Sequence, residues 1–309
     1  MDDLKQFLSN RPEHIAAYGY GSGVFKQSGY TDKDKPQKDI IIVVKDLIDY
    51  HSENMILNKG DYSWTGKLYI NNADISNLKG NTGIVYLSNI KENGSVYKYG
   101  TIEYGDFVRH LKLWDSYYLA GRFQKPIYPI SEEASLIPII EENRRQGLLL
   151  SAFLQDDEKV SKKDVLTTLC WLSYLGDTRM GIAENPDKVI NIVNGSYDKF
   201  LDMYNFDEEY FIDKGDNILI DKYYVKDELV NLPDSLYQYV LPYLEYDEEV
   251  ITEKIIEYFT NLNKFESKQQ TIKGLYTNGF SRSSAYAWAK VLKKLKSNKS
   301  KIITLNKTA

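Results

Sequence analysis

A run of glycines next to a buried strand constrains the N-terminal part of this chain most strongly. Residues 16–30 read AAYGYGSGVFKQSGY, with four glycines and two serines after a short apolar stretch. The next apolar run, residues 40–44, reads IIIVV and follows Asp39 directly. Glycine permits turns with positive φ and a close approach of a ligand to the backbone. The pattern predicts a strand at 15–20, a tight turn, and a buried strand at 39–44 that begins with a carboxylate.

The spacing of the turn excludes two phosphate-binding motifs and favours a third. Gly19-Tyr-Gly-Ser-Gly23 superficially resembles a dinucleotide fingerprint, but its third glycine falls at the wrong interval and no acidic residue ends a second strand of a βαβ unit. A phosphate loop is excluded because no lysine followed by Ser or Thr completes it. What remains is typical of nucleotidyltransferases of the DNA polymerase beta superfold, in which a Gly-Ser turn cradles a triphosphate and a strand aspartate holds Mg²⁺. An ordinary glycine turn is the alternative.

The strand that starts at Asp39 departs from the usual superfold pattern in one respect. Most such enzymes carry two carboxylates two residues apart, which point to the same face of the strand. Here Ile41 occupies the second position. A second metal ligand must therefore come from elsewhere in the chain.

The remaining periodicity divides the chain into three parts. Strands are predicted at 83–87 and 95–104, and helices at 4–11 and 107–119, the last of which ends at Gly121 with a left-handed cap. Further helices are predicted at 131–155, 163–175, 186–204, 248–262 and 284–296, with a hairpin at 211–223. The predicted class is α+β. Its parts are a nucleotidyltransferase domain at 1–130, a mostly helical, winged-helix-like domain at 131–235, and a C-terminal helical segment at 236–309 that includes a basic amphipathic helix.

Charge is distributed unevenly along the chain. The net charge is −5, but residues 267–309 hold ten Lys or Arg and no Asp or Glu, so residues 1–266 carry a balance of −15. A basic tail indicates contact with nucleic acid or with an acidic lipid surface, and a solvated helix is the alternative. The single cysteine, Cys170, excludes an intrachain disulfide and fits a core position in a reducing compartment.

Several motifs, in chain order, resemble one protein family. They are GYGSGVFKQSGY at 19–30 with Asp39, then His51, Asn54 and Asn58, Lys98-Tyr-Gly100, Trp114, Tyr118-Leu-Ala-Gly-Arg-Phe-Gln-Lys-Pro126, Leu172-Ser-Tyr-Leu-Gly-Asp-Thr-Arg-Met180, Lys188-Val-Ile-Asn-Ile-Val193, and Lys273-Gly274 with Thr277 and Gly279. Over about residues 15–290 the chain resembles the mitochondrial translocator assembly and maintenance family of phosphatidate cytidylyltransferases, which are CDP-diacylglycerol synthases.

The resemblance implies a reaction and a set of site residues. CTP and phosphatidic acid would be joined into CDP-diacylglycerol with release of pyrophosphate, with Mg²⁺ as the cofactor. The residues implied for CTP binding are Tyr20, Gly21, Ser22, Gly23, Lys98 and Arg122. Asp39 and Asp177 are implied as metal ligands, and the same two residues with Lys125 as catalytic residues. Arg179 and Lys273 are implied for phosphatidate binding. One departure concerns the lipid phosphate, because Lys264-Phe-Glu-Ser267 stands where relatives have Arg-Pro-Ser-Ser.

For some polar and aromatic residues the sequence allows both a ligand-binding and a structural role. His51, Asn54 and Asn58 lie at helical spacing on one face and could contact phosphate or metal, or form a structural hydrogen-bonded cluster. Tyr20 or Tyr86 could stack on cytosine, although most tyrosines are expected to serve packing.

Location and partners follow from the resemblance and from the tail. We expect an anionic membrane surface to bind the C-terminal basic helix, and no nucleic acid to bind. The start Met-Asp-Asp, with no basic, serine-rich presequence, favours the cytoplasmic face of a bacterial membrane over the matrix side of a mitochondrial inner membrane. Two alternatives stay open: a nucleotidyltransferase with a soluble or RNA acceptor, and a non-catalytic winged-helix protein that binds nucleic acid.

Overall fold

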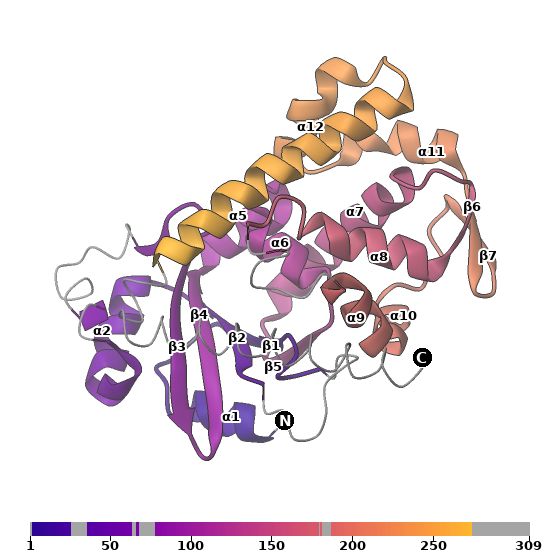
Figure 1. Cartoon of the computed structure of the whole chain (residues 1–309). Helices are drawn as coiled ribbons and strands as arrows, with labels where there is room; N and C mark the ends of the chain where they lie inside the picture. The colour runs from indigo at the N-terminus through magenta and orange to yellow at the C-terminus, as the bar shows by residue number, and fades with distance from the viewer. Residues whose placement is uncertain are drawn as a thin grey trace, which may run out of the picture.

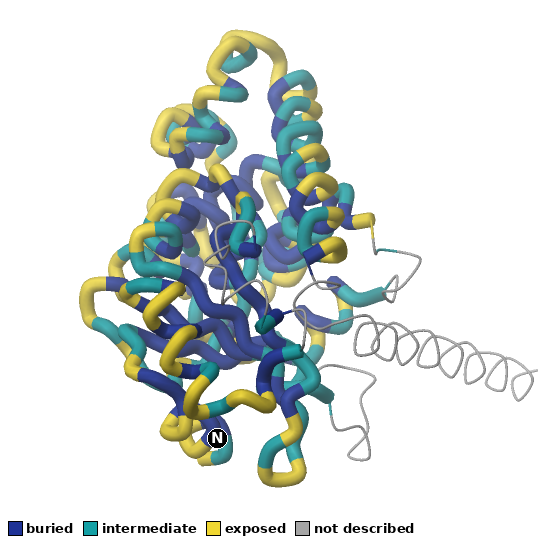
Figure 2. The backbone as a smooth tube through the Cα atoms, turned by 90° about the vertical axis from the view of Figure 1, so that its left-hand side faces the viewer, coloured by how far each residue is buried: buried dark blue, intermediate teal, exposed yellow. Residues whose placement is uncertain are grey.

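The computed structural model of the chain describes residues 2–25, 36–63, 66–67, 78–178, 180 and 187–273. It combines a five-stranded sheet with a mostly helical part that carries a small second sheet, as Figure 1 shows. Buried residues run through the strands and along the inner sides of the helices, and the exposed ones gather on outer turns (Figure 2). The predicted α+β class is confirmed.

The large sheet is mixed, with one parallel pair at its centre. Its strands are β1 (Ala16–Tyr20), β2 (Lys38–Val44), β3 (Ile84–Glu92), β4 (Ser95–Glu103) and β5 (Ile127–Ser131). They lie in the order β3-β4-β2-β1-β5; β2 and β4 are parallel, and the other neighbours are antiparallel. The sequence pattern misses β5 because Pro129 is taken as a break, whereas an edge strand tolerates proline.

Alternate residues of β2 pack on opposite faces of this sheet. Ile40 and Ile42 belong to a core shared with α1 (Asp2–Ser9) and α2 (Leu47–Leu57). Ile41 and Val43 belong to a second core, shared with the two helices that follow β4. Both faces are therefore covered, and this explains why the run IIIVV is apolar at every position.

The two helices that follow β4 replace the single helix predicted at 107–119. They are α5 (Tyr104–Leu113) and α6 (Tyr117–Phe123). The break lies at Trp114, which is fully buried and has a φ of 54°, a conformation that a bulky residue adopts only when packing holds it there. The predicted cap at Gly121 is wrong: this glycine lies inside α6, where a Cβ would come within 2.2 Å of Ser173 Oγ.

The second half of the described chain is mainly helical. Its helices are α7 (Ile137–Phe153), α8 (Lys162–Leu172), α9 (Lys188–Gly195), α10 (Tyr197–Met203), α11 (Lys222–Asp227), α12 (Asp234–Val240) and a helix at residues 248–273. A small antiparallel sheet, in the order β6-β8-β7, is made of β6 (Lys159–Ser161), β7 (Phe211–Lys214) and β8 (Asn217–Ile220). Short 3-10 segments are η1 (Lys59–Asp61), η2 (Ala134–Leu136), η3 (Glu228–Asn231) and η4 (Leu241–Tyr243).

Three predicted helices of this half differ from the observed ones. The helix predicted at 131–155 begins only at Ile137, because β5 and η2 occupy the preceding residues. The helix predicted at 186–204 is divided at Ser196, whose ψ of 24° is not helical, into α9 and α10. The helix predicted at 248–262 continues to residue 273, because polar residues such as Asn263 face the protein, where its side-chain amide donates to Leu172 O at 2.8 Å.

The helix at residues 248–273 joins the two halves of the molecule. Ile251, Ile255 and Phe259 pack in the core of the helical half. Its far end reaches the turn before β3, where Lys273 Nζ donates to Lys79 O at 2.6 Å (Figure 1). The basic helix predicted at 284–296 lies outside the described residues. No helix within the described ranges has both the length and the apolar character that crossing a bilayer would require.

Candidate active site

Strand pairing places three of the predicted site residues next to one another in the large sheet. Tyr20, the last residue of β1, pairs with Asp39 near the start of β2. Asp39 pairs in turn with Lys98 of β4. Residues directly opposite each other in paired strands have side chains on the same face. The register therefore brings an aromatic ring, a carboxylate and an ammonium group together on the face covered by α5 and α6.

The glycine turn lies directly beside the Asp39 carboxylate. Gly21 has a φ of 75°, and a Cβ on it would lie 3.2 Å from Asp39 Oδ2. The Gly21 carbonyl accepts hydrogen bonds of 3.1 and 2.9 Å from backbone N–H groups three and four residues later, which closes the turn. A Cβ on Gly23 would come within 2.1 Å of the Gln37 carbonyl oxygen, so no side chain fits there. Ser22 is half-buried between these two glycines.

Aromatic rings and cations are stacked around the same point. The Tyr20 and Tyr86 hydroxyls are 3.3 Å apart. Lys98 Nζ lies 4.2 Å from the centre of the Tyr86 ring. Arg122 Cζ lies 4.7 Å from the centre of the Tyr20 ring and 4.4 Å from that of Tyr118. Cation–π attraction of this kind holds the guanidinium in a fixed plane, as the hydrogen bond from Arg122 NH1 to Tyr118 O at 2.9 Å also does.

The electrostatics of this cluster keep Arg122 charged. Burial lowers the pKa of Arg122, but Tyr20, Tyr86, Tyr118 and Asp39 raise it, and the resulting pKa is well above its ordinary value. Burial also raises the pKa values of Tyr20 and Tyr86, so both phenols are neutral at pH 7. Asp39 is the carboxylate among the groups that raise the pKa of Arg122.

Lys125 forms a second cationic position, just beyond α6. Its Nζ donates to Gly121 O at 2.5 Å and to Ser173 Oγ at 2.7 Å. It also lies 5.4 Å from the centre of the Tyr174 ring, and Lys188 Nζ lies 5.3 Å from the same ring. Burial, with smaller contributions from Arg122 and Lys188, lowers the pKa of Lys125 to about 8. The position therefore holds a desolvated ammonium group that gains from a nearby anion.

Lys273 reaches the cluster from the end of the helix at residues 248–273. Burial lowers its pKa to about 8, while Tyr118 and Glu266 raise it. Tyr118, the tyrosine that stacks on Arg122, is thus within electrostatic range of Lys273. Because its Nζ donates to the carbonyl of Lys79, the turn before β3 fixes its position.

Glu266 lies on the same helix and faces the first turn of α6. Only 1% of the residue is exposed, and neither carboxylate oxygen has a hydrogen-bond partner in the described part of the chain. Burial raises its pKa to about 7, although the Ser116 hydroxyl and the backbone of Tyr118 and Tyr117 lower it. Desolvation outweighs the effect of these donors.

Asp39 is a described carboxylate that could hold a magnesium ion together with substrate phosphates. Within the described ranges, no group of three or more His, Cys, Asp and Glu side chains could hold a metal ion on its own. Mg²⁺ is usually bound through one or two carboxylates together with substrate phosphates and water. A carboxylate beside a glycine turn fits that mode of binding.

Comparison with known proteins assigns the chain to a family. The family described as "Phosphatidate cytidylyltransferase, mitochondrial" has a sequence model that matches residues 4–218. The chain belongs to this family.

Three relatives that bear the name "Phosphatidate cytidylyltransferase, mitochondrial" extend the match. The protein from Schizosaccharomyces pombe is 30% identical over 334 residues, which cover 95% of this chain and 85% of the relative. The Saccharomyces cerevisiae protein is 30% identical over 285 residues, which cover 90% of this chain and 66% of the relative. The human protein is 34% identical over 207 residues, which cover 65% of this chain and 45% of the relative. The match thus spans less than half of the human protein.

The family match covers most of the site but not all of it. The cluster from Tyr20 to Lys125 and the Lys188 position lie within residues 4–218. Lys273 lies beyond them and is joined to the site by the helix at residues 248–273.

Asp177, also predicted as a site residue, lies after α8 and not in the large sheet. Asp177 is buried after the end of α8, and its neighbours contact the helix at residues 248–273. A Cβ on Gly176 would lie 2.3 Å from Thr260 O, and the Thr178 and Ser267 hydroxyls are 3.3 Å apart. Arg179 lies outside the described residues. The role of Asp177 as a second metal ligand stays a prediction.

The His51 group belongs to the opposite face of the sheet and is structural. His51 Nδ1 lies 2.9 Å from the Tyr62 hydroxyl, and Nε2 lies 2.8 Å from Thr101 Oγ1. Asn54 donates to Tyr62 and Tyr99 at 2.8 and 2.7 Å. Burial lowers the pKa of His51 to about 3, so the ring is neutral.

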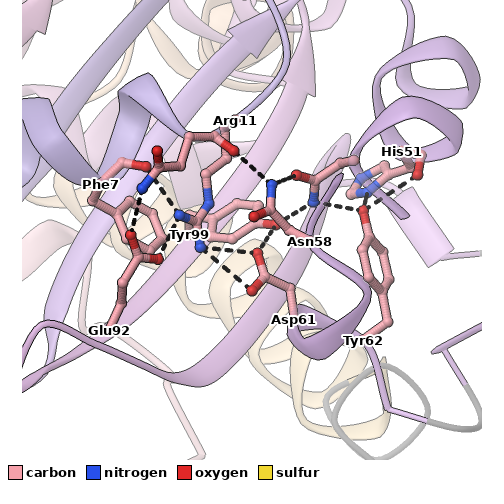
Figure 3. A network of polar contacts seen from close by, with 10 residues as sticks. Phe7, Arg11, His51, Asn58, Asp61, Tyr62, Glu92 and Tyr99 are labelled. Atoms are coloured by element: carbon pink, nitrogen blue, oxygen red, sulfur yellow. Dashed lines mark hydrogen bonds and ion pairs between the residues drawn. The ribbon is translucent and has the colours of Figure 1, made fainter. Parts of the chain in front are cut away.

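The same network continues to a buried ion pair, as Figure 3 shows. Tyr99 donates to Asp61 Oδ2 at 2.9 Å, and Arg11 NH2 lies 3.1 Å from the same oxygen. Asn58 donates to Asn54 Oδ1 at 2.9 Å. His51, Asn54 and Asn58 thus form the hydrogen-bonded structural cluster that was one of the two predicted alternatives.

Sequence reasoning overlooked three residues of the site. Tyr118 precedes Arg122 by one helical turn, a spacing that could have indicated their contact. Ser173 and Lys188 stand in motifs quoted for the resemblance, but neither was singled out. Their contact with the region around Lys125 depends on how α8 and α9 pack, which the spacing of residues does not reveal.

Proposed function

We propose that this chain is a phosphatidate cytidylyltransferase, which joins CTP and phosphatidate into CDP-diacylglycerol and pyrophosphate. The observation that carries the proposal is the pairing of Asp39 with Tyr20 and Lys98, beside the Gly21 turn, in a chain of this family. The names of the relatives supply the substrates.

The glycine turn and Asp39 would receive the nucleotide. The backbone N–H groups and the Ser22 hydroxyl between Gly21 and Gly23 would bind phosphate oxygens of CTP. Asp39 would hold Mg²⁺ against the same phosphates, and the ion would supply charge neutralisation. Asp177 stays the proposed second ligand. The Tyr20 ring, packed against Arg122, offers a flat surface on which cytosine could stack.

The reaction itself needs positioning more than it needs a base. A phosphate oxygen of phosphatidate forms a bond to the α-phosphorus of CTP, and the bond from that phosphorus to the oxygen bridging to the β-phosphorus breaks. Pyrophosphate leaves with the electron pair of that bond. Because a phosphate monoester has a second pKa near 6, the attacking group is mostly a dianion at pH 7, and no side chain has to remove a proton.

Charge repulsion between the two substrates is the larger barrier. CTP and phosphatidate together carry about five negative charges, and fixed cations must offset them. We assign Lys98 and Arg122 to the CTP phosphates and Lys125 to the transferring group. Lys273, which reaches the site beside Tyr118, would bind the phosphate of phosphatidate together with Arg179.

We propose the same division of the chain as the sequence predicts. The five-stranded mixed sheet supports a nucleotidyltransferase superfold domain at 1–130. Helices α7 to α9, followed by the β7–β8 hairpin and its partner β6, support a winged-helix-like domain at 131–235. Residues 236–309 would form the C-terminal segment.

We further propose that the enzyme works at a membrane surface. Residues 267–309 hold ten basic and no acidic residues, and a cluster of this kind gains about 1 kcal/mol per Lys or Arg near an anionic bilayer. Peripheral binding to the cytoplasmic face of a bacterial membrane, or to the matrix side of a mitochondrial inner membrane, would suit phosphatidate as a substrate.

A turnover assay tests this function directly. The purified chain is incubated with labelled CTP, Mg²⁺ and vesicles that contain phosphatidate, and labelled lipid and pyrophosphate are measured. We expect stoichiometric formation of both. A label that enters a soluble or RNA product would support a different acceptor, and salt-sensitive nucleic-acid binding without turnover would contradict an enzymatic role.

An isosteric variant tests the role of Asp39 within that assay. Asp39→Asn is expected to lower kcat by about 10²-fold or more, because the charge that faces Arg122 and the metal is lost. Asp49→Asn, an exposed position on α2, is the matched control and should keep wild-type turnover. Full activity of Asp39→Asn with an unchanged Tm would refute the metal assignment.

A further inference from the structure

The C-terminal end of α6 obtains its hydrogen-bond partners from distant parts of the chain. The last carbonyls of a helix have no partner within the helix and must find one elsewhere. Phe123 O accepts from Arg144 Nε at 3.2 Å, and Ala120 O, which also accepts from Gln124 N at 3.2 Å, accepts from Asn143 Nδ2 at 3.1 Å. The Tyr204 hydroxyl donates to Gln124 O at 2.9 Å. Side chains of α7 and of Tyr204, the C-cap residue of α10, thus fix a helix of the nucleotide-binding half.

Asn143 and Gln124 form the buried centre of this arrangement. Asn143 Oδ1 accepts from Trp114 Nε1 at 2.8 Å and from Gln124 Nε2 at 3.3 Å. Gln124 Nε2 also donates to Asn143 O at 3.2 Å, and Gln124 Oε1 accepts from the Tyr117 hydroxyl at 2.5 Å. The exposed fractions are 1% for Asn143 and 0% for Gln124. Each side-chain amide is therefore held at both its oxygen and its nitrogen, out of contact with water.

Close packing fixes the Gln124 side chain as well. A Cβ on Gly147 of α7 would lie 2.7 Å from Gln124 Cδ and 2.7 Å from its Nε2. The glycine therefore allows the amide to rest directly on the backbone of α7. Any larger residue at this position would push the amide away.

The chain position of Gln124 links this network to the cations of the site. Arg122 precedes it by two residues, and Lys125 follows it directly. Arg122 lies between the rings of Tyr20 and Tyr118, and Lys125 reaches Ser173 Oγ. The direction in which both cations point depends on the last turn of α6 and on the backbone at Gln124, which acts as its cap.

We propose that Asn143 and Gln124 are positioning residues for nucleotidyl transfer. They hold the last turn of α6 so that Arg122 and Lys125 face the reacting phosphates, although neither amide reaches the substrate. The inference rests on the proposed function, because it concerns the cations assigned to that reaction. It also makes α7, in the helical half, a structural requirement for the chemistry in the other half.

Two variants disturb the network in different ways. Asn143→Ala removes the amide that joins Ala120 O, Trp114 and Gln124. Gly147→Ala removes no polar group and displaces the Gln124 side chain, and Leu169 Cδ1, 2.9 Å from the added Cβ, must shift as well. We expect each to lower kcat/KM for CTP by about 10²-fold, since a misplacement of about 1 Å at a catalytic group costs that much. KM for phosphatidate should change less than twofold.

A matched control separates positioning from general loss of packing. Ser151→Ala, on the same helix, removes a buried hydroxyl that donates to Gly147 O at 2.7 Å. All variants are assayed well below their own Tm. We expect Ser151→Ala to stay within twofold of wild type. Losses in Asn143→Ala and Gly147→Ala no larger than in this control would overturn the inference.

Coupling to the two cations gives a second, sharper test. If Asn143 acts through the two cations, Asn143→Ala should lower turnover by less than about threefold in an Arg122→Ala/Lys125→Ala background, since coupled sites are not additive. A full 10²-fold further loss would show that Asn143 acts independently of both cations, and would contradict the proposal.

Hydrogen exchange tests the inference without relying on turnover. In Asn143→Ala the amides of residues 117–125 should lose protection while those of β2 keep it. If the wild-type chain makes no CDP-diacylglycerol, the proposed function fails, and this measurement alone decides on positioning. Unchanged protection at residues 117–125 then refutes it, and a local loss supports it.

Discussion

Tyr86 and Gly100 pair directly across β3 and β4, and the tyrosine ring lies against the glycine backbone. A Cβ at position 100 would come within 2.5 Å of Tyr86 Cε1 and 2.7 Å of Ile84 Cγ2. The glycine therefore lets the ring lie flat, with its hydroxyl 3.3 Å from that of Tyr20 and Lys98 Nζ 4.2 Å from its centre. The arrangement of one wall of the site depends on the absence of a single methyl group.

Gly100→Ala should accordingly damage the site more than the fold. We expect a stability loss of about 1–3 kcal/mol from overpacking, and a drop of at least tenfold in kcat/KM for CTP as Tyr86 is displaced. Gly105→Ala is the control, because that glycine lies in α5 with open space around it and the change should stabilise the helix by up to about 1 kcal/mol. Denaturant unfolding and CTP kinetics measure both effects. Wild-type kinetics in Gly100→Ala would mean that the Tyr86 position is unimportant.

Arg122→Lys tests whether charge alone is required at that position. A lysine keeps the charge but loses the planar group that stacks between Tyr20 and Tyr118, so we expect kcat/KM for CTP to fall about tenfold or more. Arg122→Ala should lose at least tenfold more. Equal activity of the lysine variant and the wild type would show that stacking contributes nothing to turnover.

Glu266 and His51 should influence stability with opposite dependence on pH. The folded-state pKa of Glu266 is raised from 4.5 to about 7, so the folded state binds more protons, and stability falls as pH rises through that interval. At about 1.4 kcal/mol per pKa unit the full effect is roughly 3 kcal/mol. Glu266→Gln should therefore be more stable than wild type at pH 8 and nearly equal to it at pH 4.5, in urea unfolding at both values. An equal difference at both pH values would contradict the raised pKa.

His51 gives the reverse dependence. Its pKa is lowered from 6.5 to about 3, so the unfolded state binds more protons, and stability is lost as pH falls below 6.5. At pH 5 the loss is about 2 kcal/mol relative to neutral pH. In His51→Gln this part of the acid sensitivity should disappear. Between pH 4.5 and 6.5 the two slopes oppose each other in the wild type, so each single variant exposes the slope of the other residue. Parallel pH profiles for the wild type and His51→Gln would refute the assignment.

The sequence predicts those parts of the site that depend on local pattern. A glycine turn followed by an aspartate at the start of a β-branched run indicates a phosphate-binding strand, and Gly21 lies beside Asp39 in the structure. The helical spacing correctly puts His51 and Asn54 on one side of α2, and Asn58 follows as the C-cap of that helix. Their place on the face of the sheet opposite to Asp39 depends on strand order, which no local pattern encodes.

Long-range packing explains what the sequence does not predict. Trp114 adopts a positive φ because its indole is held by Asn143 and its carbonyl by the Tyr258 hydroxyl at 2.8 Å, 144 residues away. The spacing of apolar residues continues across this break, so a single helix is the natural prediction. Lys273 was singled out only through a resemblance. The helix at residues 248–273 brings Lys273 to the turn before β3. In the sequence, the polar residues on the inner side of this helix look the same as residues that face solvent.

Tyr20, Asp39 and Lys98 take their places from the hydrogen-bond ladder that pairs β1, β2 and β4. If one of these strands slipped by a single residue, its side chain would turn to the far side of the sheet, into the apolar layer beneath α1 and α2. A chain folded with the wrong alignment would thus lack catalytic competence altogether instead of retaining a weakened form of it. The activity measured per mole of purified protein would then report the fraction of molecules in which β1, β2 and β4 have the correct register.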